Sequence, residues 1–133
     1  MARLTTEYKG DMLFQTSVGT HSVLADVPEA WGGKNRGLTP PQLLVTSIGA
    51  CVGAVVANYC NKVGLDAEGM KVDVEFEKAD DPVRLQDIEI FIELPNVDVT
   101  GREKAIKRVA EHCPVHETIC SISRTDIHVS GQK

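Results

Sequence analysis

The segment from Thr39 to Asn61 has no charged residue and consists mainly of apolar and small residues. Thr39 is a good N-cap for a helix, and Gln42 three residues later completes a capping box. Gly64 supplies the left-handed residue with which many helices end. Because apolar residues fall on nearly every face, the pattern predicts a helix that ends near Val63 and is buried all round.

The segment before this helix has the pattern of a small antiparallel sheet. Two β-prone runs flank Gly10-Asp11, which is a two-residue hairpin signal, and a third run follows Gly19-Thr20. The predicted strands are residues 3–9, 12–17 and 21–26. Residues 27–38 are rich in Gly and Pro and therefore predict a loop.

Apolar and polar residues alternate in two segments after the helix, 71–77 and 87–94. This period of two predicts a hairpin with one solvated face, with Val72, Val74 and Phe76 pointing inward.

The last third of the chain predicts two helices and a strand. Thr100 and Glu103 have the spacing of a second capping box and begin a helix that ends near His112. Pro114 stops that helix and is the first residue of a shorter one, up to about Cys120. A final strand is expected at 125–129. With the two helices around Pro114 counted as one, the order βββ-α-ββ-α-β predicts an α+β domain with antiparallel strands.

The length and charge of the chain limit the classes of function. The chain has 133 residues, which suits one domain over 1–133, and its net charge of −5 without a basic run argues against nucleic acid as a partner. No apolar leader follows the N-terminus, so we expect a cytoplasmic protein with reduced cysteines.

The uncharged stretch is also long enough to span a membrane, but its scattered polar residues, among them Gln42, Ser47 and Asn58, favour a soluble core helix without a membrane partner. A helix buried all round needs more covering material than a chain of this size supplies. This predicts a homodimer.

Two cysteines occupy positions that suggest chemistry. Cys113 precedes Pro114 and is expected at a helix N-cap, where the helix dipole lowers the pKa of a thiol. Cys51 is too far from its helix start for that effect, and its thiolate needs a cation such as Arg36 or Lys34. The alternative is that Cys51 is a small buried apolar residue, as we expect for Cys60.

A metal site is a further alternative. Cys113, His116 and Cys120 are spaced along one helix, with His112 just before it, and residues of these types bind zinc. Structural zinc sites usually combine two ligand clusters, and the sequence has no second one. We therefore predict no metal.

The segment GLTPPQLLVTSIGACVGAVV, followed some sixty residues later by CPVHETI, resembles the family of osmotically inducible protein C and organic hydroperoxide resistance proteins (OsmC/Ohr). The resemblance covers nearly the whole chain. It implies an OsmC-like α+β fold, in which antiparallel sheets wrap a long buried central helix and two chains intertwine as a homodimer.

The resemblance also implies thiol-dependent reduction of small-molecule organic hydroperoxides. Cys51 matches the peroxidatic cysteine and Cys113 the resolving one, so the implied intermediates are a Cys51 sulfenic acid and a Cys51–Cys113 disulfide. No bound cofactor is implied, only an external dithiol reductant such as a lipoyl group or a small thiol. Arg36 is the best match to the family's catalytic Arg, and Lys9 is a weaker one.

The chain departs from the family pattern at one position. Typical peroxidase members carry a Glu ten residues before the first cysteine to orient the Arg, and Pro41 stands there in this chain. This departure favours the alternative function, a non-catalytic protein that binds a small apolar ligand or senses oxidants through the same thiols.

Overall fold

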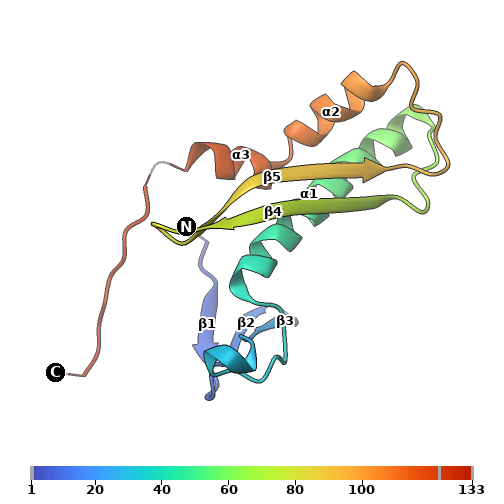
Figure 1. Cartoon of the computed structure of the whole chain (residues 1–133). Helices are drawn as coiled ribbons and strands as arrows, with labels where there is room; N and C mark the ends of the chain where they lie inside the picture. Colours follow the sequence, from blue (N-terminus) through green and yellow to red (C-terminus); the bar gives the residue numbers. More distant parts are fainter. Residues whose placement is uncertain (1, 123, 133) are drawn as a thin grey trace. The chain divides into compact units, whose positions relative to one another are not determined.

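The computed structural model describes residues 2–122 and 124–132, and the chain divides into two compact units (Figure 1). The first unit contains the residues up to Ser47 together with Phe76–Ile88, and the second contains Ile48–Glu75 and the residues from Glu89 onward. Helix α1 and strands β4 and β5 run through both units.

The first unit begins with a three-stranded antiparallel sheet in the order β1-β2-β3. The strands are β1 (Thr5–Tyr8), β2 (Phe14–Val18) and β3 (His21–Ala25). In this register Tyr8 lies opposite Phe14, and their ring centroids are 5.2 Å apart. The three strands predicted before the long helix are confirmed. The loop that follows contains one turn of 3-10 helix, η1 (Glu29–Trp31).

Helix α1 (Pro40–Val63) begins and ends where the sequence predicts. The capping box is reciprocal: the Thr39 N–H donates to Gln42 Oε1 at 2.9 Å, and the Gln42 N–H donates to Thr39 Oγ1 at 3.3 Å. At the other end Gly64 has a φ of 77°, and the Leu65 N–H donates to the Cys60 carbonyl at 2.8 Å. These bonds satisfy backbone groups that a helix end otherwise leaves unpaired.

One face of α1 is buried. Within the second unit the buried residues of α1 are Ile48, Val52, Val56 and Cys60. The valines of β4 lie over the glycines of the helix, with Val74 beside Gly49 and Val72 beside Gly53. The opposite face, with Ala50, Ala54 and Asn58, is exposed. Burial all round is therefore wrong for a single chain, because one chain supplies covering side chains for one face only, whereas the core position of Cys60 is confirmed.

By length and composition alone, α1 also qualifies as a membrane-spanning helix. Core helices of soluble proteins pass the same test, and in the structure β4 packs across Gly49 and Gly53 on one face of α1.

Strands β4 (Lys71–Ala79) and β5 (Arg84–Glu93) form the predicted two-stranded sheet. Val72 and Val74 are partly covered, as their alternation with polar residues predicts. Phe76, which was also predicted to point inward, has 40% of its surface exposed, so that prediction is wrong.

The helix after the hairpin, α2 (Glu103–Glu111), lacks the predicted capping box. Its N-cap is Arg102, without a side-chain cap, because the Thr100 N–H is already bonded to the Asp98 carboxylate at 3.0 Å. This local Asx turn ends before the helix begins and competes with the capping arrangement.

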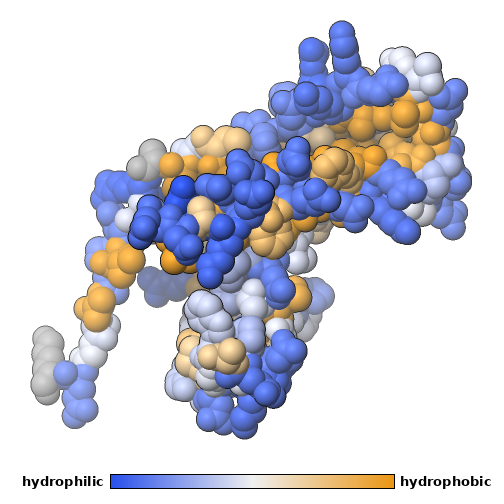
Figure 2. All heavy atoms as spheres, in the orientation of Figure 1, coloured by the Kyte–Doolittle hydropathy of each residue, from blue (hydrophilic) through white to orange (hydrophobic). Residues whose placement is uncertain are grey.

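The C-terminal part contains a third helix, α3 (Pro114–Ser121), and then an extended segment, 124–132, that has no strand assignment. The strand predicted at 125–129 is therefore wrong for the single chain, because within the described residues no strand pairs with it. The segment leaves Ile127 and Val129 exposed over 86% and 92% of their surfaces, and apolar residues are visible along the extended tail in Figure 2. The observed order is βββ-α-ββ-α-α.

Candidate functional site

The structure brings Cys51 and Cys113 together in the second unit. Cys51 lies in the middle of α1 and is half-buried, whereas Cys113 is fully buried. Cys113 is the N-cap of α3 and Pro114 is its first residue, as predicted. The Cys113 Sγ accepts a hydrogen bond from the His116 N–H at 3.5 Å, so its position is fixed by the first turn of the helix. Both thiols are free.

Burial raises the pKa of the Cys113 thiol, and its hydrogen bond with the Cys51 thiol raises that pKa further. The N–H groups of His116 and Val115 act in the opposite direction but are outweighed. The helix start lowers the pKa of Cys113 as predicted, but burial and Cys51 outweigh it, so the predicted net direction is wrong. A side chain with no exposed surface loses its contact with water, and the loss of hydration disfavours a thiolate.

The Cys51 side chain acts on Cys113 both through a hydrogen bond and through charge, so the two sulfurs lie beside each other within the second unit. Neighbouring sulfurs are what a disulfide between two cysteines requires.

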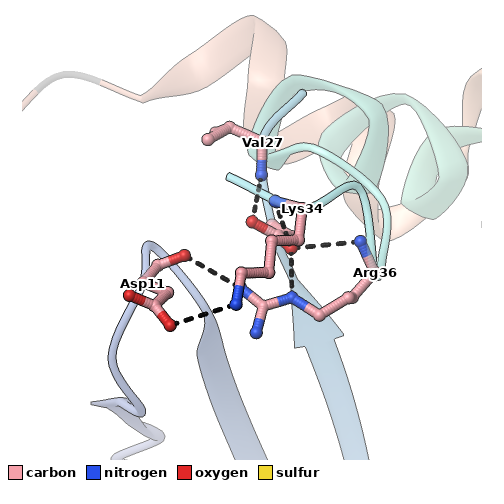
Figure 3. A network of polar contacts seen from close by, with 5 residues as sticks. Asp11, Val27, Lys34 and Arg36 are labelled. Atoms are coloured by element: carbon pink, nitrogen blue, oxygen red, sulfur yellow. Dashed lines mark hydrogen bonds and ion pairs between the residues drawn. The ribbon is translucent and has the colours of Figure 1, made fainter. Parts of the chain in front are cut away.

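Arg36 lies in the first unit, where the carboxylate of Asp26 fixes it (Figure 3). Asp26 Oδ2 accepts from Arg36 Nε at 2.7 Å, from the Arg36 N–H at 3.0 Å and from the Lys34 N–H at 3.3 Å. Asp26 Oδ1 accepts from the Val27 N–H at 2.7 Å. Arg36 Nη2 also donates to the Asp11 carbonyl at 2.8 Å. The pKa of the buried Asp26 lies far below its usual range, and the largest cause is its hydrogen bond with the Arg36 side chain.

Asp26 is a residue that the sequence analysis missed. The family pattern places the carboxylate that orients the Arg ten residues before the first cysteine, where this chain has Pro41. The available signal was an Asp at the end of a strand and directly before a Gly-rich loop, where its side chain readily accepts from backbone N–H groups. Arg36 therefore has a carboxylate partner from a different part of the chain.

Replacing Asp26 with Asn is expected to change how stability depends on pH. An unfolded Asp protonates near pH ~3.9, whereas in the folded protein the Asp26 carboxylate resists protonation. Its contribution to the free energy of unfolding is therefore present above about pH 4 and lost as the pH falls towards the lower folded pKa. Urea unfolding at several pH values should show the wild type more stable than Asp26→Asn at pH 7, with the difference shrinking below about pH 4. An equal difference at pH 3 and pH 7 contradicts this role.

The residues of the alternative metal site have other partners. Cys113 bonds to the His116 N–H, and the His116 ring lies between the Glu111 carbonyl and Cys120. Across residues 2–122 and 124–132, no three His, Cys, Asp or Glu side chains gather as a metal site.

Comparison with known proteins identifies the family. The model of the family described as OsmC-like protein matches residues 33–128. The chain belongs to the OsmC-like family. A search of curated proteins found no match. Solved structures that share the fold include the OsmC-like protein from Mycoplasma pneumoniae, with 19% identity, a TM-score of 0.75 and coverage of 90% of this chain and 87% of that one.

Organic hydroperoxide resistance proteins are among the OsmC-like structures with this fold. OhrB of Bacillus subtilis has 16% identity, a TM-score of 0.62 and coverage of 89% of both chains. The Legionella pneumophila protein has 17% identity, a TM-score of 0.63 and coverage of 90% of both chains. At these identities the likeness establishes the α+β OsmC-like fold with antiparallel sheets and a long helix.

Proposed function

We propose that this protein is a thiol-dependent peroxidase that reduces organic hydroperoxides through Cys51 and Cys113. The single observation that carries the proposal is that Cys113, buried at the start of α3, lies beside Cys51 in the middle of α1. Two neighbouring thiols can pass through a sulfenic acid to a disulfide, which is the chemistry of a two-cysteine peroxidase.

The proposed cycle has three balanced steps. The Cys51 thiolate attacks the distal oxygen of the hydroperoxide, the O–O bond breaks, and the leaving alkoxide takes a proton to become an alcohol. This step leaves Cys51 as a sulfenic acid. Cys113 then attacks the sulfenic sulfur and releases water, which forms the Cys51–Cys113 disulfide. A dithiol, such as a reduced lipoyl group, reduces that disulfide and becomes a cyclic disulfide itself.

Asp26 bears on the alternative of a non-catalytic sensor or binding protein. That alternative rests on the absence of a carboxylate at Pro41, but Arg36 has a buried carboxylate partner in Asp26. Arg36 therefore has a carboxylate that orients it, and the lack of Glu at position 41 no longer argues for the non-catalytic alternative. The role of Arg36 as the cation that stabilises the thiolate stays a prediction from the family resemblance, and Arg36→Lys, which keeps the charge but loses the Nε contact, is its test.

Steady-state assays test the proposed function. Purified protein with reduced dihydrolipoamide should consume cumene hydroperoxide over many turnovers, with one dithiol oxidised for each peroxide. Consumption of a single equivalent, with the protein left oxidised in the presence of the dithiol, supports the sensor instead. If the thiols remain intact under excess peroxide, both the peroxidase and the sensor hypothesis are wrong.

We also propose that two chains form a homodimer. The exposed face of α1 and the exposed apolar residues Ile127 and Val129 of the unpaired C-terminal segment are surfaces that a second copy covers. An extended segment with alternating apolar residues is suited to join the edge of a sheet in another chain.

Sedimentation velocity measures the assembly state directly. We expect a dimer for the wild type and a large shift towards monomer for the double variant Ile127→Ser/Val129→Ser. Val83→Ser is the matched control, because Val83 is also an exposed valine, at 69%, but lies outside the C-terminal segment. A monomeric wild type at all concentrations, or a double variant that dimerises as strongly as the wild type, contradicts the proposal.

A further inference from the structure

We propose that Cys120 is a second reactive thiol, separate from the Cys51–Cys113 pair, and that His116 activates it for exchange with small disulfides. Cys120 is exposed near the end of α3, whereas Cys113 is buried at the start of the same helix. The proposal rests on the contacts of the His116 ring, which the proposed peroxidase cycle does not use, and it stands or falls independently of that cycle.

The two nitrogens of the His116 ring have different partners. Nδ1 lies 3.1 Å from the carbonyl oxygen of Glu111, and Nε2 lies 3.8 Å from the Sγ of Cys120. A carbonyl oxygen only accepts hydrogen bonds, so Nδ1 carries the ring proton in the neutral imidazole. The lone pair of Nε2 then faces the thiol.

This arrangement has the elements of an activated nucleophile. A nucleophilic side chain lies beside a base, and a third group orients the base. Residues four apart lie on the same face of a helix, so α3 itself holds His116 and Cys120 together. The backbone N–H of His116 holds Cys113 Sγ, so one residue fixes the buried thiol through its main chain and contacts the exposed thiol through its ring.

Charged residues also lie near Cys120 along the chain. Glu117 lies one turn earlier on α3, and Arg124 beyond the helix pairs with Asp126 at 2.7 Å. On the preceding helix, Glu111 faces the histidine through its main-chain carbonyl.

The proposed reaction is thiol–disulfide exchange. The Cys120 thiol passes its proton to His116 Nε2, and its sulfur attacks one sulfur of a low-molecular-weight disulfide. A bond forms between Cys120 and that sulfur while the original S–S bond breaks. The leaving thiolate takes the proton back from His116. The product is a mixed disulfide on α3 and one free small thiol.

The experiment uses 5,5′-dithiobis(2-nitrobenzoate) as the disulfide and the full chain as the protein. Fragment-ion mass spectrometry of the peptide that contains both Cys113 and Cys120 assigns the label at each time point. At pH 7 we expect Cys120 of the wild type to react about fivefold faster than Cys120 of His116→Gln. The two proteins should converge near pH 10, where an ordinary exposed thiol is ionised without a base.

Two further variants complete the test. His112→Gln is the matched control, because His112 Nδ1 also lies beside a carbonyl, that of Arg108 at 2.7 Å, at the end of the neighbouring helix. The reagent should label Cys120 of this variant at the wild-type rate. The variant Cys120→Ser should lack the fast phase of labelling, which we assign to Cys120. Convergence at pH 10 shows that His116→Gln leaves the thiol accessible. Equal rates at pH 7 for the wild type and His116→Gln, or a fast phase that survives in Cys120→Ser, overturn the proposal.

Discussion

Replacing Cys51 with Ser is expected to lower hydroperoxide turnover with a dithiol by at least about a thousandfold. The thiolate is the nucleophile in this chemistry, and a serine hydroxyl stays protonated at neutral pH and does not form a sulfenic acid. The substitution removes a single sulfur from the middle of α1, so the fold should survive. Coupled assay of cumene hydroperoxide consumption, with circular dichroism to confirm folding, measures the effect.

Serine variants of Cys113 and Cys120 test whether the loss of turnover is specific to Cys51. Cys113→Ser should react once with peroxide and stop as a Cys51 sulfenic acid, which dimedone traps, because the resolving thiol is missing. Cys120→Ser is the control, since Cys120 lies at the exposed end of α3, and its turnover should equal that of the wild type. Turnover by Cys51→Ser within tenfold of the wild type removes Cys51 from the mechanism.

Replacing Gly33 with Ala is expected to destabilise the first unit by about 3 kcal/mol or more, because the added methyl has no room. An ideal Cβ at Gly33 lies 2.1 Å from the Val27 carbonyl oxygen and 2.4 Å from Asp26 Oδ1. Relief of this clash requires the loop to move away from Asp26, which breaks the bonds from Lys34 and Arg36 to its carboxylate. Because the methyl meets backbone, a change of side-chain rotamer does not remove the clash.

Chemical unfolding followed by the fluorescence of the single tryptophan, Trp31, reports on this loop directly. Gly131→Ala is the matched control, because a Cβ at Gly131 meets nothing within 4 Å. We expect its midpoint to coincide with that of the wild type, while the midpoint of Gly33→Ala falls. An unchanged midpoint for Gly33→Ala means that the loop is not packed on Asp26 as described.

Local signals in the sequence were sufficient for most of the elements. The ends of α1 depend on Thr39, Gln42 and Gly64, whose hydrogen bonds join residues only a few positions apart, and the prediction is confirmed. The strand predicted at 125–129 is different, because the segment has no strand assignment in the structure. A strand also needs a neighbour, and its own sequence carries no information on whether the same chain or another provides one.

In the site, too, features set by adjacent residues were predicted correctly, and features set by residues far away in the sequence were not. The N-cap position of Cys113 follows from the adjacent Pro114 and is confirmed. The pKa of Cys113 depends on burial and on Cys51, which lies far away in the sequence, and its direction was predicted wrongly. The pairing of Asp26 with Arg36 depends on a loop that folds back on β3, so the position of Asp26 before a Gly-rich loop predicts bonds to backbone N–H groups but does not identify Arg36 as the partner.

The most direct test of the account is the state of the two sulfurs after one equivalent of cumene hydroperoxide, before any reductant is added. We expect the intact mass to fall by the mass of two hydrogen atoms per chain, and peptide mapping without reduction to link the peptide of Cys51 to that of Cys113. Cys60 should remain a free thiol. A protein whose Cys51 and Cys113 both remain open to alkylation, or whose disulfide joins a different pair, contradicts the central claim.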